Sequence, residues 1–211
     1  LGRATSMGLV GLSGNTVTVE VDISDGLPHY NLLGLPDAAL NESRDRVRAA
    51  LVNSGEVWPN RKVTVSLSPA ELRKEGAYFD VAIALGYLLA TGFIKQNLER
   101  KLFIGELSLD GVVRPVRGLL SIAKWAKENG FTELFIPKEN ETEAAFIEGV
   151  SFYLVPTLAE LVSFLNGTGE KLCLSNTEKM RVPSFDIGVS LVYVSRQMPT
   201  EIDWHFTGRP V

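Results

Sequence analysis

The feature that most constrains the fold is an almost uninterrupted apolar segment at residues 80–92, DVAIALGYLLATG. Asp80 can begin a helix and Gly92 can end one, so the segment predicts a helix of about three turns. Its apolar side chains point in every direction, which indicates a helix buried on most sides. Its apolar part is about half as long as a bilayer requires, so it is too short to cross a membrane. The rest of the chain must therefore build a core around this helix.

The surrounding sequence alternates between strand and helix patterns. Residues 16–23 and 62–67 place every second apolar side chain on one face, and Asp110-Gly111 is a dipeptide favoured in tight hairpins. Strands are predicted at residues 16–23, 29–34, 62–67, 102–109, 112–116, 133–136 and 152–155. Further helices are predicted at residues 37–53, 117–129, 141–147 and 158–166, with a short helical turn after Ser68. This mixture predicts an α/β (α+β) fold, a two-layer sandwich with a mixed sheet.

Composition excludes several classes of protein. The net charge is −4, which does not support a strongly basic nucleic-acid binder, although a local basic patch remains open. The single cysteine, Cys173, excludes an internal disulfide framework, and the only histidines are His29 and His205, which argues against a multi-histidine metal centre. No signal peptide is recognisable, so we expect a cytoplasmic protein with no membrane partner. No G-x-x-x-x-G-K-[ST] occurs, so no nucleotide phosphate cradle of that type is expected in the chain.

The sequence changes character after Gly167. Residues 168–186 are polar without a clear period, which predicts a linker. Residues 187–211 have no organisation that we can interpret beyond one strand at 187–194. Because the chain begins at Leu1 rather than methionine, we expect a fragment or processed chain, or a product that is truncated or disrupted in frame after Asp186.

Seven ordered segments give the chain a family resemblance. They are residues 19–23 (VEVDI), 34–37 (GLPD), 42–48 (ESRDRVR), 68–76 (SPAELRKEG), 79–80 (FD), 105–111 (GELSLDG) and 115–118 (PVRG). With them, residues 9–167 resemble the N-terminal domain of the magnesium-chelatase-like AAA+ proteins called YifB or competence protein ComM. The resemblance implies a Lon-peptidase-like fold that precedes an ATPase module.

The resemblance also implies where Lon-type chemistry would be. The Lon pattern D-G-P-S-A-G lies over residues 75–80, with Tyr78 in place of the serine, and the pattern G-G-L-K lies over residues 117–120, with Leu120 in place of the lysine. A serine nucleophile needs a base to accept its proton, so losing both residues removes that route. We therefore predict no catalytic residues, no cofactor and no metal in this chain.

One alternative keeps a peptidase. Lys124 follows Leu120 by one helical turn, so it shares the same helix face and could approach a hydroxyl group. The simpler interpretation, which we prefer, is a solvated helix lysine. A third class, a metal-chelatase motor subunit, is suggested only by the family name and would need a nucleotide site that the chain lacks.

Basic residues at three places are candidate contacts for DNA or for a neighbouring protomer. They are Arg44 and Arg48 one helical turn apart, Arg73 and Lys74 in a loop before the apolar helix, and Arg114 and Arg117 beside Pro115. The alternative at each place is a solvated charged surface. For the first pair this alternative is supported by acidic neighbours, including Glu42 at i,i+4 spacing to Arg46.

The resemblance implies a function for the parent protein. Such a parent is a ring-forming ATPase, a hexameric homo-oligomer that acts on DNA and assists branch migration during recombination in natural transformation. ATP and magnesium are then expected only in the ATPase module. The present domain would assist ring assembly and guide DNA.

Overall fold

The computed structural model describes residues 1–10, 13–74, 76–169 and 172. The predicted tail at residues 187–211, with its strand at 187–194, lies outside the described residues, as does most of the predicted linker.

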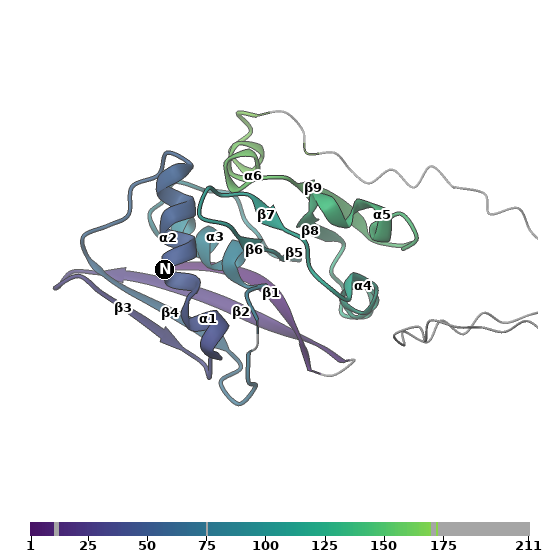
Figure 1. Cartoon of the computed structure of the whole chain (residues 1–211), viewed down its shortest axis with the longest axis horizontal. Coiled ribbons are helices and arrows are strands. Elements are labelled where there is room, and N and C mark those ends of the chain that lie inside the picture. The colour runs from purple at the N-terminus through teal and green to yellow at the C-terminus, as the bar shows by residue number, and fades with distance from the viewer. Residues whose placement is uncertain (11–12, 75, 170–171, 173–211) are drawn as a thin grey trace, which may run out of the picture. The chain divides into compact units, whose positions relative to one another are not determined.

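Four strands form a mixed sheet in the order β1-β2-β4-β3 (Figure 1). They are β1 (Gly2–Val10), β2 (Ser13–Ser24), β3 (His29–Leu33) and β4 (Lys62–Ser68). Strand β2 pairs antiparallel with both of its neighbours, whereas β3 pairs parallel with β4. The strands predicted at residues 16–23, 29–34 and 62–67 are confirmed, and so is the mixed character of the sheet.

Strand β1 was not predicted, and the expected domain start at residue 9 is too late by this strand. Its inward positions carry small residues, Gly2, Ala4 and Ser6, which give no apolar alternation to read. The small size is required, because a Cβ atom added to Gly2 would lie 1.8 Å from the carbonyl oxygen of Gly86. The first strand can therefore lie against the central helix only through nearly bare backbone.

The apolar segment forms the predicted central helix, α3 (Asp80–Ala90), in which every residue from Asp80 to Leu88 is buried. It packs against β1 and β2, on the sheet face that also carries α1 (Ala38–Asn41) and α2 (Ser43–Asn53) (Figure 1). The side chains of Val17, Val19 and Val21 on β2 face it. The large core of the protein thus lies between this sheet and α2–α3.

The single helix predicted at residues 37–53 is divided at Glu42. Asp37 caps its start, because its Oδ1 accepts the Leu40 N–H at 2.8 Å. At the division, the Asp45 N–H donates to the Glu42 carbonyl at 3.1 Å, a three-residue step that tightens the backbone.

A second, parallel sheet has the order β5-β8-β9, and a separate hairpin joins β6 to β7. The strands are β5 (Lys101–Phe103), β6 (Glu106–Leu107), β7 (Val113–Arg114), β8 (Glu133–Pro137) and β9 (Ser151–Val155). The hairpin at Asp110-Gly111 is confirmed, but the strand predicted at residues 102–109 is split. The break occurs at Gly105, where φ is 157° and a Cβ atom would lie 2.4 Å from Val113 Cγ1.

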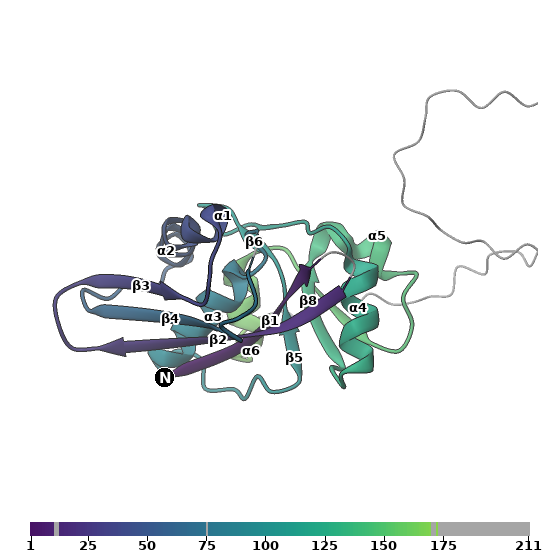
Figure 2. The same ribbon diagram turned by 90° about the horizontal axis from the view of Figure 1, so that it is seen from below.

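The remaining helices cover the parallel sheet. They are α4 (Leu119–Glu128), a short 3₁₀ turn at Lys138–Asn140, α5 (Glu141–Ala144) and α6 (Leu158–Leu165). Figure 2 shows α1 and α2 beside β3 and β4, and α4 and α5 grouped together beside β8. The expected α/β class is confirmed, with the strands divided over three sheets.

The helical turn expected after Ser68 is absent from the described residues of this segment, which form a turn and an isolated bridge between Pro36 and Lys74. The backbone of Lys74 is already used across the chain: its N–H donates to Leu35 at 3.2 Å and its carbonyl accepts from Asp37 at 3.0 Å. Since these groups serve the bridge, they are not available to a local helix.

Candidate functional site

Tyr78, at the position that the resemblance assigns to the Lon-type serine, lies where the loop enters α3. Tyr78 is partly buried, and its ring packs against the second apolar core, which includes Ile104, Val116 and Leu119. Its carbonyl accepts the Gly105 N–H at 3.1 Å, which fixes this loop against the break between β5 and β6. Tyr78 therefore occupies a packing position.

The position of the Lon-type lysine lies in the first turn of α4. Leu119 is buried there, whereas Leu120 is 57% exposed and so points outward. The N–H of Leu120 donates to Glu143 Oε1 at 3.1 Å. Lys124, one turn further along, is also exposed. Within the part of the chain that the structure describes, neither the Tyr78 hydroxyl nor the Lys124 ammonium has a hydrogen-bond partner.

A buried ion pair lies at the start of α3, and the sequence analysis did not predict it. Asp80 is fully buried and accepts hydrogen bonds from Arg46 Nε at 2.7 Å, Arg46 Nη2 at 3.1 Å and the Leu107 N–H at 3.2 Å. Burial raises the pKa of Asp80 from 3.8 to about 6, although Arg46 acts in the opposite direction. The i,i+4 contact of Arg46 with Glu42 is present at 3.7 Å but is the weaker partner. Three elements meet at this carboxylate: α2, α3 and the hairpin.

The loop before α3 was predicted to present two cations at the surface, but only one of them is exposed. Arg73 is exposed, but Lys74 is only 1% exposed, and its Nζ donates to the Pro69 carbonyl. Burial lowers the pKa of Lys74. The prediction of Lys74 as a surface contact is therefore wrong, because its ammonium closes the turn on the inside.

Arg114 and Arg117 are both exposed, as a surface contact would require. Arg114 lies in β7, and Arg117 precedes Gly118, whose φ of 76° begins α4. Both therefore stay candidate contacts.

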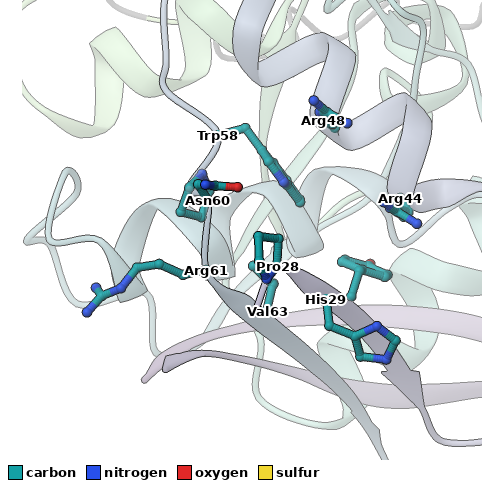
Figure 3. Close-up of a pocket in the computed structure, with 10 residues that line it drawn as sticks. Pro28, His29, Arg44, Arg48, Trp58, Asn60, Arg61 and Val63 are labelled. Atoms are coloured by element: carbon teal, nitrogen blue, oxygen red, sulfur yellow. The ribbon is translucent and has the colours of Figure 1, made fainter. Parts of the chain in front are cut away.

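Arg44 and Arg48 are brought together at a pocket, together with His29 and Trp58 from other elements (Figure 3). The pocket has a volume of about 140 Å³ and lies between α2, the start of β3 and the segment that precedes β4. The sequence placed the two arginines on one helix face. The residues that complete the pocket could not be identified, because they are distant in the chain.

Two further properties bear on function. Among the described residues, no group of three or more His, Cys, Asp or Glu side chains is arranged to hold a metal ion. In the same part of the chain, no helix combines the length and apolarity needed to span a bilayer.

Comparison with known proteins adds relatives to this geometry. The chain is 48% identical over 169 residues to an uncharacterized protein of Mycobacterium tuberculosis, 40% over 167 residues to competence protein ComM of Haemophilus influenzae, and 39% over 159 residues to YifB of Escherichia coli. These matches cover 80%, 79% and 75% of this chain, but only 34%, 32% and 31% of the relatives. The chain thus spans about a third of the length of these curated relatives.

A more distant likeness links the chain to Lon proteases. The Lon protease of Treponema pallidum is 25% identical over 186 residues, which covers 82% of this chain and 21% of that protein. The likeness agrees with the Lon-type pattern at residues 75–80 and 117–120.

A match to a described family decides the membership of this chain. Residues 19–140, more than half of the chain, match the family described as subunit ChlI of Mg-chelatase. This stretch contains α2, α3 and the hairpin, and it therefore includes Tyr78, Asp80 and Leu120. With ComM and YifB among its relatives, the chain belongs to this Mg-chelatase-like family.

Proposed function

We propose that the chain is a non-catalytic, Lon-like N-terminal module of a ComM-type AAA+ ATPase. In this role it assists assembly of the ring and the handling of DNA during branch migration. ATP and magnesium belong to the ATPase module of the longer protein, and the site of action is the cytoplasm. The ComM and YifB relatives support the assignment of the module, since this chain aligns with only a third of each.

The observation that carries the non-catalytic part is the orientation at the lysine position. Leu120 points outward from α4, while Tyr78 packs inward on the apolar core. A nucleophile and its base must lie within about 3 Å of each other to share a proton. Tyr78 also makes no hydrogen bond to Lys124 among the described residues, so the remaining route through Lys124 has no geometric support.

Peptidase activity can be tested directly. The purified chain is incubated with an unfolded protein substrate, beside a Lys124→Ala variant and an active Lon protease. We expect no cleavage above background from either form of the chain. Cleavage by the wild-type chain that disappears in Lys124→Ala would reject the non-catalytic assignment.

The assembly and DNA roles need a separate measurement. The mass of the chain in solution is determined by light scattering, with and without a four-way DNA junction. A hexameric mass, or a junction-dependent increase in mass, is the expected result. A chain that stays monomeric and does not bind the junction at low salt would contradict the assembly and DNA roles. Only a structural role for the domain would then remain.

A further inference from the structure

The pocket beside α2 collects basic side chains from distant parts of the chain. Arg44 and Arg48 project into it from α2, while His29 and Pro28 approach from the start of β3 (Figure 3). Trp58 stands between the two groups, and Asn60 lies beside it. The site thus joins cations, an imidazole, an amide and an indole ring around one hollow.

Among the cations that line the pocket, Arg44 and Arg48 are the two that form no ion pair with a described carboxylate. Both are exposed, and no carboxylate forms an ion pair with either within the part of the chain that the structure describes. Arg61 also lines the pocket, but its Nε donates to Asp25 at 3.1 Å and its side chain extends away from the others in Figure 3. A local surplus of two positive charges therefore exists on a chain whose net charge is −4.

Aromatic contacts hold the walls of the pocket in place. The Arg44 guanidinium carbon lies 5.8 Å from the centre of the Tyr30 ring, a cation–π contact that orients the fork. Trp58 stacks on Tyr87 with ring centres 5.1 Å apart and planes 9° apart, and the Tyr87 hydroxyl donates to the Val57 carbonyl at 2.6 Å. Because these groups are ordered without a ligand, less ordering cost remains for binding.

The nearest phenol carries no charge at neutral pH. A tyrosine hydroxyl is protonated there even at its ordinary pKa of about 10, and burial raises the pKa of Tyr30 further, to about 12. An incoming anion therefore meets two unpaired guanidinium groups without repulsion from this ring.

Size and chemistry decide what the pocket can hold. The pocket volume of about 140 Å³ leaves room for one phosphate group with some of its waters. Guanidinium groups bind phosphate oxygens in a bidentate way, which a lysine cannot match.

We propose that this pocket binds a single phosphate group of a nucleic-acid strand, held by Arg44 and Arg48 while the rest of the strand stays outside. The choice of a strand over a free nucleotide rests on the proposed DNA role; the phosphate chemistry does not. Trp58 lines the pocket, so its fluorescence can report on occupancy.

Binding can be followed through Trp58 fluorescence. The chain has three tryptophans, Trp58, Trp125 and Trp204, so the reporter background is Trp125→Phe/Trp204→Phe. On that background the full chain is titrated with inorganic phosphate, with thymidine monophosphate and with a short single-stranded thymidine oligonucleotide. Arg44→Gln/Arg48→Gln is compared with the charge-matched Lys95→Gln/Lys138→Gln, at two exposed positions that do not line the pocket. Circular dichroism of each variant confirms that it is folded.

We expect the oligonucleotide to change Trp58 fluorescence, with affinity at least roughly tenfold weaker in Arg44→Gln/Arg48→Gln and unchanged in the control pair. If thymidine monophosphate saturated the pocket with the same affinity as the oligonucleotide, the phosphate site would be supported. The proposed ligand would then be a free nucleotide, and the nucleic-acid strand would be rejected. Equal affinities in the two variant pairs, or no response to any of the three ligands, would overturn the proposal.

The same design separates this inference from the proposed function. If the four-way junction shifts the mass of the chain but Arg44→Gln/Arg48→Gln binds it normally, the DNA role stands and the pocket has no part in it. If the oligonucleotide binds in the pocket but the junction has no effect, the phosphate site stands and the branch-migration role fails.

Discussion

At the scale of single residues, the buried carboxylate of Asp80 joins α2, α3 and the hairpin. It is fully buried and accepts three hydrogen bonds, two from Arg46 and one from the hairpin N–H of Leu107. Burying a charge costs several kcal/mol, and a partner offsets the cost only when its geometry is good. The pKa of Asp80, raised from 3.8 to about 6 by burial, indicates that the offset from Arg46 is incomplete. The pair therefore fixes α2 against α3 and the hairpin more than it stabilises the fold.

Removing Arg46 should make stability depend on pH. A folded-state pKa above the unfolded value means that the contribution of Asp80 is fully present below about pH 4 and is lost as pH rises through the folded pKa. Because Arg46 lowers that pKa, Arg46→Met should move it higher and extend the loss beyond pH 6. We expect Arg46→Met to lower the free energy of unfolding by about 3–5 kcal/mol at pH 8, and by clearly less at pH 5. Urea unfolding at the two pH values measures this.

The matched control is Arg48→Met, half a turn further along α2, because this arginine has no carboxylate partner among the described residues. It should change the free energy of unfolding by less than about 0.5 kcal/mol at both pH values. Adding Asp80→Asn to Arg46→Met should recover stability at pH 8, since the unpaired charge is then gone. An Arg46→Met effect of the same size at pH 5 and pH 8 would contradict the argument.

At the scale of elements, the central helix packs closely against the large sheet through glycine. A Cβ atom at Gly86 of α3 would lie 2.6 Å from Val21 Cγ2, and one at Gly2 of β1 would meet the Gly86 carbonyl. Valine is stiff on a strand, so its methyl group cannot move aside easily. Glycine in α3 is therefore retained for close packing at the expense of helix propensity.

This predicts the sign of a simple substitution. In an exposed helix, Gly→Ala would stabilise by up to about 1 kcal/mol, but overpacking costs about 1–3 kcal/mol. We expect Gly86→Ala to lower the free energy of unfolding in urea by about 1–2 kcal/mol. The double variant Val21→Ala/Gly86→Ala should be less destabilised than the sum of its single variants, because the new methyl group fills the space that Val21 leaves. If Gly86→Ala raised the free energy of unfolding, the contact between helix and sheet would have room for a methyl group, and the argument from close packing would fail.

The elements that could be predicted from the sequence are those that leave a hydrophobic pattern in it. The helix α3 was predictable because its apolar run and its terminal residues agree, and β2 and β4 because their apolar residues alternate. Strand β1 was not, because Gly2, Ala4 and Ser6 leave no hydrophobic signal at the positions that face the core. The break of a predicted strand at Gly105 was missed for a related reason: the requirement comes from Val113, which is close only in the fold.

The candidate site divides in the same way. Spacing alone put Arg44 and Arg48 on one helix face, whereas the two Lon-type positions were assigned only through the family resemblance. Spacing could not pair Arg46 with Asp80, which is 34 residues away and belongs to another helix. Nor could it reveal that Lys74 is turned inward to a carbonyl group, since that depends on the bridge between Pro36 and Lys74. Contacts of this kind are set by tertiary packing and have no periodic signature.

At the scale of the whole molecule, one strand links the two apolar cores. Ala4 of β1 belongs to the core under α3, whereas Met7 of the same strand belongs to the core under α4. Gly14 on the paired strand lies so close that a Cβ atom would meet both Met7 and Trp125. The two apolar cores therefore meet along β1 and β2.

Charge at this scale makes the salt dependence of binding a sharp test. With a net charge of −4, the chain as a whole repels nucleic acid, so attraction must come from local contacts. Each phosphate that a protein neutralises on a single strand contributes a slope of about −0.7 to a plot of log affinity against log salt, so the one phosphate held by Arg44 and Arg48 gives about −0.7. Raising sodium chloride from about 50 to about 200 mM should then weaken oligonucleotide binding by a factor of roughly 2.6. Arg44→Gln/Arg48→Gln should remove most of this slope, while Lys95→Gln/Lys138→Gln should leave it intact. A slope that falls equally in both variant pairs would mean that the strand is attracted by diffuse charge and that neither pair forms a site.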